Sequence, residues 1–244
     1  HTLRQSQQVA LRLFERAEPL IEPGVTTKRL DQALHAWMIE EGCTPSFLGY
    51  RGFPAVSCIS VNEEVVHAIP GPRVLHEGDL VTLDLGVIWK GFHADAARTY
   101  GVGKIGPEAK TLLETTRESL DLAIGKMAVG ERLSVIGRTV QTFAEARGFS
   151  VVAASFGQGI GREMHEDPQV HNYVDDRILR KDVVMKSGLV IAVEPMVNAG
   201  TDEVEQLHDG WTVVTKDRRL SAHFEDTIAL TNDGPRVLTR PMAR

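Results

Sequence analysis

Residues 79–100 read DLVTLDLGVIWKGFHADAARTY and contain two strand-like runs separated by a short polar turn. The apolar run Val81–Trp89 predicts a buried strand, and Phe92–Tyr100 predicts a second strand that returns beside it. Lys90 and Gly91, between the two runs, have the length of a two-residue hairpin turn. The sequence therefore predicts an antiparallel β-hairpin.

Two aspartates of this hairpin are predicted to share one face. A two-residue turn places Asp84 opposite Ala97. Because side chains alternate between faces, Asp95 shares the face of Ala97 and therefore of Asp84, at a diagonal backbone separation of about 7–8 Å. Two carboxylates with no cation beside them repel each other, and a divalent metal bridged by them would remove that cost. The alternative interpretation is the ordinary polar face of a half-exposed strand.

Two more acids stand on predicted strands in the second half of the chain. Glu194 ends the apolar run Leu189–Val193 and is followed by Pro195, and Glu225 lies in the run Ala222–Leu230. A carboxylate at the tip of a buried strand is costly unless it is paired or ligated. Four acids on strands of both halves are typical of a two-metal site with oxygen ligands.

Apolar residues at helical spacing predict four helices, over Thr2–Ile21, Thr27–Glu41, Glu108–Met127 and Leu133–Arg147. Thr27 has a suitable side chain to cap the second helix, and Gly42 is its predicted stop. Residues 43–80 are expected to form loops and short strands.

The order of elements repeats along the chain. Gly24 and Gly42 recur as Gly130 and Gly148 at a constant offset of 106 residues. Each half then reads helix, helix, and strands with two acids. The preferred interpretation is a duplicated α+β unit whose acids meet between the halves, and the alternative is two unrelated helix pairs of similar length.

Composition narrows the function classes. The 244 residues suit one large domain or two fused halves, and the net charge of -6 argues against a nucleic-acid-binding protein. The basic stretches Arg177–Lys181 and Lys216–Arg219 are interpreted as solvated loop charge. No apolar run is long enough for a transmembrane helix. Cys43 and Cys58 are too few for a disulfide framework, and no signal-peptide pattern is present, so the cytoplasm is the expected location.

Two polar segments carry histidines. Residues 60–70 read SVNEEVVHAIP and place His67 between apolar residues, while residues 157–168 read GQGIGREMHEDP and contain His165. The glycines of the second segment predict a close backbone approach. The glycine pattern of this segment is similar to the GxGxxG motif of dinucleotide-binding proteins. We reject a dinucleotide-binding function, because the segment is not followed by a strand–helix unit with a later acid that could bind a ribose. His93 and His223 neighbour the predicted metal strands and stay undecided, and no role is assigned to His35, His76, His171 or His208.

Together these segments resemble the methionine aminopeptidases of the bacterial type I class, members of the M24 pita-bread metallopeptidases. The matching text covers nearly the whole chain and lies at residues 60–70, 78–99, 159–170, 188–200 and 209–227. The resemblance implies the pita-bread fold: an α+β duplication with pseudo-two-fold halves and a curved antiparallel sheet covered by helices. It also implies a single catalytic domain over residues 1–244, with halves of about 1–105 and 106–244.

The same resemblance implies the site residues. The metal ligands for two divalent ions (Co, Mn, Fe or Zn) are Asp84, Asp95, Glu194 and Glu225. Glu194 is also the expected proton carrier, His165 contacts the scissile amide, and His67 lies near the substrate amine. Both histidines also count as substrate-binding residues. The methionine side-chain pocket is matched by Tyr50, Phe53, Cys58, Met164 and Trp211. The family usually has phenylalanine at the position of Met164.

Gln158 departs from the family. The fifth metal ligand is the first histidine of a Gly-His-Gly-Ile-Gly string, and here that string contains Gln158 instead. A primary amide is a weaker ligand than imidazole for Mn, Fe, Co or Zn. Three interpretations follow: an enzyme with a weakened first metal site, an enzyme that prefers a harder ion such as Mn or Mg, or a decayed paralogue kept for binding.

The implied function is metal-dependent removal of the N-terminal methionine from nascent proteins and peptides, with a small second residue preferred. One alternative is a catalytically weakened or inactive paralogue that binds peptide N-termini. Another is a proline dipeptidase, which uses the same ligands but normally carries an additional N-terminal domain. The expected partners are nascent polypeptide N-termini and Met-peptides, with a transient ribosome contact that no motif indicates. The chain is expected to be a monomer without a membrane or specific nucleic-acid partner.

Overall fold

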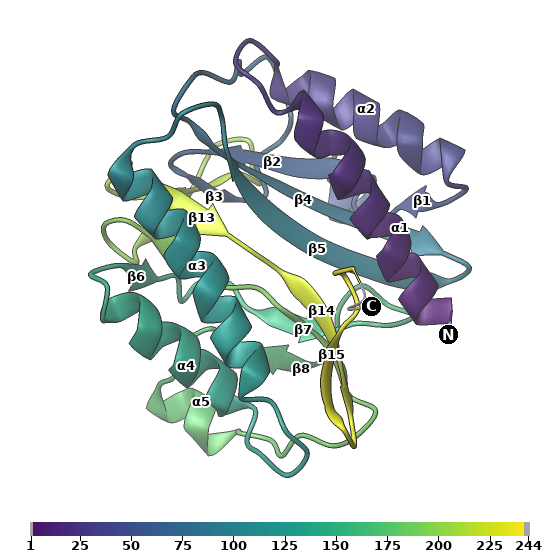
Figure 1. Cartoon of the computed structure of the whole chain (residues 1–244), viewed down its shortest axis with the longest axis vertical. Coiled ribbons are helices and arrows are strands. Elements are labelled where there is room, and N and C mark those ends of the chain that lie inside the picture. The colour runs from purple at the N-terminus through teal and green to yellow at the C-terminus, as the bar shows by residue number, and fades with distance from the viewer. Residues whose placement is uncertain (1, 242–244) are drawn as a thin grey trace.

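The predicted hairpin is the central feature of the first half of the molecule (Figure 1). In the computed structural model, which describes residues 2–241, β4 (Leu80–Trp89) and β5 (Phe92–Gly101) pair antiparallel. Lys90 and Gly91 have positive φ angles of 48° and 76°, as the mirror-image hairpin turn requires. Asp84 lies opposite Ala97, so the predicted register is confirmed.

Short strands and two helices complete this half. On its other edge β4 pairs with β1 (Thr44–Pro45) and β2 (Ser57–Val61), and β3 (Glu64–Val66) follows. Helix α1 (Thr2–Ala17) continues into a 3₁₀ turn (Glu18–Leu20), α2 spans Thr27–Glu40, and a second 3₁₀ turn spans Tyr50–Gly52. The face of β4 formed by Val81, Leu83, Leu85 and Val87 packs with both helices in one buried cluster, opposite to Asp84.

The predicted cap of α2 is wrong by one residue. Thr26 is the N-cap, and its side chain accepts a hydrogen bond from the Arg29 amide. The Thr27 hydroxyl instead exchanges hydrogen bonds with the backbone of Gly71. Thr27 therefore ties the start of the helix to the loop that follows β3.

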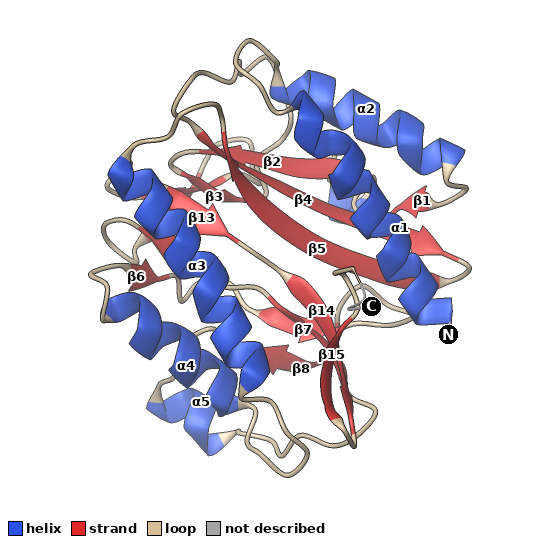
Figure 2. Ribbon diagram, in the orientation of Figure 1, coloured by secondary structure: helices blue, strands red, loops and turns tan. Residues whose placement is uncertain are grey.

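The second half repeats helices followed by strands. Helices α3 (Pro107–Gly125) and α4 (Ser134–Glu145) form a second helix pair, and Figure 2 shows the two pairs lying over the strands of their respective halves. The remaining elements are β6 (Ser150–Val151), β7 (Gly157–Gly159), β8 (Glu166–Val170), α5 (Asp176–Arg180), β9 (Val190–Val193), β10 (Met196–Asn198), β11 (Val204–Gln206), β12 (Val213–Thr215), β13 (Ser221–His223), β14 (Asp226–Thr231) and β15 (Gly234–Val237). The largest sheet has the order β15-β14-β9-β7-β8, and its pairings are antiparallel.

The backbone hydrogen bonds repeat along with the elements. The Gly24 amide donates to the Leu75 carbonyl, and the Gly130 amide, 106 residues later, donates to the Met185 carbonyl. Both glycines have φ near +94° (94° and 93°), a conformation that favours glycine. Equivalent bonds at equivalent positions support the duplication. The boundary of about 105 between the halves stays a prediction.

Strand pairing ends or changes at Glu194 and Glu225, the two glutamates of the second half. The strand predicted over Ala222–Leu230 is interrupted, because β13 pairs with β10 whereas β14 pairs with β9. The break falls between His223 and Asp226, and there Glu225 exchanges backbone hydrogen bonds with Ala97 of β5. Glu194 likewise lies just beyond the end of β9 rather than within it. Both acids therefore stand where the strands of the two halves meet.

The two basic stretches carry exposed, paired charges. Their ion pairs are Arg177–Asp175, Lys216–Glu203, Arg218–Glu205 and Arg219–Glu108. In Lys216–Arg219 every basic side chain is therefore paired with an acid, whereas in Arg177–Lys181 the pairing involves Arg177. Among the described helices, none combines the length and the apolar character of a membrane span.

Asp226 fastens the end of the chain to β14. Its fully buried carboxylate accepts hydrogen bonds from Arg98, Thr239 and Arg240. We expect Asp226→Asn to lower the free energy of unfolding by about 2 kcal/mol, because one amide nitrogen then faces buried donors. Urea unfolding followed by circular dichroism measures this. The exposed Asp233→Asn variant serves as a control, and equal midpoints for both variants would refute this assignment.

Candidate active site

Three carboxylates converge at the junction of the halves. Oxygen atoms of Asp84 (β4), Asp95 (β5) and Glu225 lie within 4.8 Å of one another. All three residues are buried, and each has one carboxylate oxygen, Oδ1 or Oε1, with no hydrogen-bond partner. Buried polar atoms are normally satisfied, so unsatisfied oxygens on three neighbouring carboxylates indicate a ligand site. The residues present fit a divalent cation with oxygen ligands.

Glu194 belongs to the same cavity although it lies outside that close group. The Asn172 side chain donates a hydrogen bond to the Glu194 carbonyl at 3.0 Å and so holds its backbone. The Glu194 side chain is 14% exposed and faces the cavity. It therefore lines the same cavity as the three converging carboxylates.

The four acids are electrostatically linked. Burial raises the pKa of Asp84 to about 7. Burial, together with repulsion from Asp84, raises the pKa of Asp95 well above its usual range. Burial and the neighbouring carboxylates do the same to the pKa of Glu194 and of Glu225. Cations that bind here therefore replace protons.

The metal-free protein should become less stable as the pH rises from about 4 to about 7. The folded state holds the Asp84 proton up to a pKa of about 7, whereas the unfolded chain releases it near 3.8. The unfolded state then binds fewer protons within this window, and the free energy of unfolding falls with pH. Thermal unfolding with chelator at several pH values measures the fall. The Asp84→Asn variant should flatten this profile, and an unchanged slope would contradict the prediction.

Gln158 occupies the centre of β7, between glycines that have a packing role. A Cβ atom on Gly157 would overlap the Ala192 carbonyl oxygen of β9, and one on Gly159 would overlap the Asp167 carbonyl oxygen of β8. The close backbone approach predicted from these glycines is confirmed, and the partners are the neighbouring strands. Gln158 is 6% exposed and lines the cavity.

His67 and His165 both project into the cavity. His67 has φ of +59°, which is uncommon for a residue other than glycine and suggests a functional constraint. Desolvation by the surrounding protein, followed by the charge of His165, lowers the pKa of His67. The His67 side chain is nevertheless open to the cavity. The Tyr50 hydroxyl is 2.8 Å from Nδ1 of His165 and orients that ring. Burial and the nearby Arg51 lower the pKa of His165, so both imidazoles are neutral near pH 7.

The two undecided histidines, His93 and His223, do not line the cavity. Nδ1 of His93 is 3.0 Å from the Ser46 hydroxyl, which supports a structural role. His223 is almost fully buried, and burial followed by the charge of His67 lowers its pKa to about 3. His223 is therefore a neutral imidazole beside the carboxylates.

An apolar pocket adjoins the acids. The five residues expected to line the methionine pocket lie in one cluster: Tyr50, Phe53, Cys58, Met164 and Trp211. The rings of Phe53 and Trp211 pack edge to face, with centroids 5.0 Å apart. Burial and the charge of Asp84 raise the pKa of the Cys58 thiol, so it remains uncharged. The acids, both histidines and this pocket open into one cavity of about 610 Å³.

Sequence reasoning missed some residues of the site. Phe47 lines the cavity and the apolar cluster. The sequence feature that goes with Phe47 is Gly86, a glycine within the predicted strand. The Phe47 ring packs against Gly86 so closely that a Cβ atom there would come within 2.6 Å of the ring. Arg98 was also missed, and it donates to the carbonyl of Glu225 and to the carboxylate of Asp226. A charged residue on a buried strand three positions after Asp95 was the available signal.

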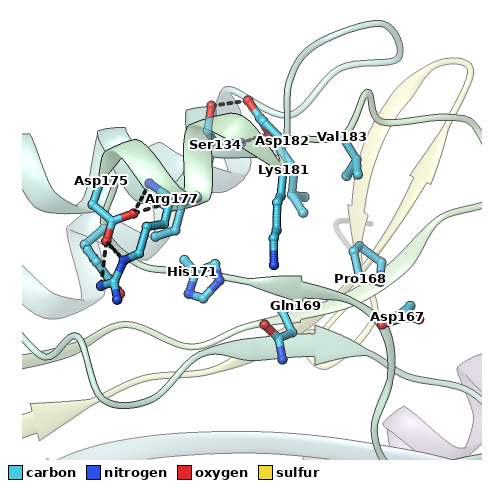
Figure 3. Close-up of a pocket in the computed structure, with 13 residues that line it drawn as sticks. Ser134, Asp167, Pro168, Gln169, His171, Asp175, Arg177, Lys181, Asp182 and Val183 are labelled. Carbon is cyan, nitrogen blue, oxygen red and sulfur yellow. Dashed lines mark hydrogen bonds and ion pairs between the residues drawn. The ribbon is translucent and has the colours of Figure 1, made fainter.

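A second cavity of about 650 Å³ lies between α5 and β8. Figure 3 shows Lys181 extending towards Gln169, while Arg177 is held by Asp175 at one side. The second cavity shares Asp167 and Gln169 with the first. It is lined by none of the predicted catalytic, metal or pocket residues.

Comparison with known proteins identifies the family. The model of metallopeptidase family M24 matches residues 1–232. Methionine aminopeptidase 1 of Bacillus subtilis (strain 168) is 45% identical over 238 residues, covering 98% of this chain and 95% of that protein. The methionine aminopeptidase of Escherichia coli (strain K12) is 44% identical over 239 residues, covering 97% of this chain and 89% of that protein.

Solved structures agree with these relatives. The methionine aminopeptidase of Thermotoga maritima superposes with a TM-score of 0.94 at 37% identity, covering 98% of this chain and 96% of that one. The prolidase of Pyrococcus furiosus shares the fold, with a TM-score of 0.79 at 20% identity, and the match spans 64% of its length. These likenesses confirm the predicted α+β pita-bread fold. The chain belongs to metallopeptidase family M24 and, within it, to the methionine aminopeptidases of the bacterial type I class.

Proposed function

We propose that this chain removes the N-terminal methionine from peptides and nascent proteins whose second residue is small, using two divalent cations. The observation that carries the proposal is one cavity that combines four buried acids with an apolar pocket. Asp84, Asp95, Glu194 and Glu225 would hold the cations, with the Gln158 amide oxygen as a weak fifth ligand. Bound cations supply Lewis acidity and make water nucleophilic near neutral pH.

The apolar pocket supports selection of methionine. A thioether packs favourably against aromatic edges, and the Phe53–Trp211 pair offers such edges. Cys58 lies opposite Asp84 in the β2–β4 pairing, which places the apolar pocket directly beside the acids. A substrate whose side chain fills the pocket therefore presents its amine to Asp84 and His67. This arrangement favours a free N-terminus over an internal peptide bond.

The proton transfers are assigned to Glu194 and His165. Glu194 takes a proton from the attacking water and passes it to the leaving amide nitrogen, a transfer suited to a carboxyl whose pKa is raised. His165, oriented by Tyr50, donates a hydrogen bond to the scissile amide and stabilises the tetrahedral state. Only the imidazole nitrogen that Tyr50 leaves free can reach the substrate.

The setting of the activity is part of the proposal. Cys43 and Cys58 are both free thiols, which agrees with a reducing compartment such as the cytoplasm. The monomeric state and the transient ribosome contact stay predictions. The alternative of an inactive paralogue receives no support from the relatives, which carry the name methionine aminopeptidase.

Peptide hydrolysis tests the function directly. The chelated protein, loaded in turn with Co, Mn, Fe or Zn, should cleave Met-Ala-Ser with at least one ion and leave Ala-Pro intact. Cleavage of Ala-Pro alone would establish the prolidase alternative. Binding of Met-peptides without turnover with any ion would establish the inactive alternative. Chelator added to the active form should abolish cleavage, and returning the ion should restore it.

A further inference from the structure

His223 is a buried imidazole without a hydrogen-bond partner. It is 1% exposed, and both of its ring nitrogens are buried and unsatisfied. Buried polar side chains are normally hydrogen-bonded, and an unpaired one calls for an explanation such as a catalytic role or a nearby bound ion. His223 ends β13, two residues before Glu225.

The carboxylate of Glu194 lies close to this imidazole. Nε2 of His223 lies 3.8 Å from Oε2 of Glu194. Within the described part of the chain, no hydrogen bond reaches the Glu194 carboxylate. Rotation of the carboxylate about its last torsion, which is broad and weakly restrained, can shorten this separation to hydrogen-bond distance.

The backbone of His223 is fixed, so the carboxylate is the part that can adjust. The His223 amide donates to the Thr99 hydroxyl at 2.9 Å, and that hydroxyl is 2.7 Å from the His223 carbonyl. Strand pairing sets His223 opposite Met196 on β10. The backbone that carries the imidazole is thus anchored by two strands, and Glu194 lies just beyond the end of a third, β9.

We propose that His223 is a positioning residue for Glu194: its Nε2–H donates a hydrogen bond to Oε2 of the ionised carboxylate and leaves Oε1 to face the cations. The assignment rests on the proposed function, since it treats Glu194 as a cation ligand. Hydrogen-bond partners of metal ligands commonly contribute 10–100-fold to metal affinity. Such support is needed here because Gln158 supplies a neutral amide where the family has imidazole.

Paired variants separate the hydrogen bond from the shape of the ring. His223→Gln keeps an N–H donor, whereas His223→Phe keeps a flat ring and loses the donor. We expect His223→Phe to weaken Co(II) affinity about tenfold in calorimetric titration. The kcat for Met-Ala-Ser should fall with it, while KM changes less than about twofold. His223→Gln should retain most of both, and the exposed His208→Gln should match the parent protein.

Three results would overturn the assignment. The first is Co(II) affinity of His223→Phe equal to that of the parent. The second is equal loss in the Gln and Phe variants with lowered thermal stability of the chelated proteins, which indicates a packing role. The third is a strongly shifted, exchangeable imidazole N–H resonance of the Co(II)-loaded protein that disappears in His223→Gln, which makes His223 a direct ligand. If no variant cleaves Met-peptides but the affinity pattern holds, the proposed function fails and the role of His223 stands.

Discussion

Replacing Glu194 by glutamine is expected to lower kcat for Met-Ala-Ser by about 10³-fold, within the 10²–10⁴ range of general acid–base catalysis. The amide has nearly the shape of the carboxylate but cannot accept the proton of the attacking water. Its loss also removes a charged cation ligand from the cavity wall. Steady-state kinetics at saturating Co(II) measure the effect, with metal content determined on the same samples.

The matched control is Glu163→Gln. Glu163 is exposed, precedes His165 by two residues, and does not line the cavity. We expect its kcat to stay within about twofold of the parent. If Glu194→Gln keeps both cations and retains more than about a tenth of kcat, another group carries the proton, and the role assigned to Glu194 is wrong.

The hairpin could be predicted because its geometry is local. The turn at Lys90 and Gly91 sets the register of β4 and β5, and the register sets the faces of Asp84 and Asp95. Turn length and alternation are readable from neighbouring residues alone. No knowledge of the rest of the chain was needed to place these two carboxylates together.

Other features depend on distant partners and could not be read in this way. The strand around Glu225 breaks because β13 and β14 pair with different strands. Thr26 and Thr27 are equally good caps by residue type, and only the contact of Thr27 with Gly71 decides between them. Local patterns therefore identified the acids. They did not reveal that strand pairing switches from β10 to β9 around Glu225, which places this residue at the site.

The contribution of His223 is of the same kind. Its position two residues before Glu225 marked it as near the metal strands, but the sequence does not reveal which atom it faces. The distance to Glu194 depends on how β13 and the end of β9 meet in space. Long-range packing, which one sequence does not encode visibly, supplies this information.

Gln158→His is expected to tighten binding of the more weakly held cation by about 100-fold. Mutating a residue that only hydrogen-bonds to a metal ligand already costs up to about 100-fold in metal affinity, and position 158 is expected to contact the metal itself. The two side chains have similar reach, so the strand β7 need not move. Imidazole is also a better ligand than an amide for Co, Mn, Fe or Zn. At limiting Co(II), kcat/KM for Met-Ala-Ser should rise in proportion to occupancy, which calorimetry and metal analysis measure together.

The structure provides a matched control for adding a histidine to this wall. Gln169 lies directly opposite Gln158 in the pairing of β7 and β8 and lines the same cavity. Gln169→His should leave Co(II) affinity within about threefold of the parent, because position 169 matches no ligand of the family. Unchanged affinity and rate in Gln158→His would mean that the amide is not the weak point of the site. A gain at low Co(II) that vanishes at saturating Co(II) would locate the cost of Gln158 in cation binding rather than in the chemical step.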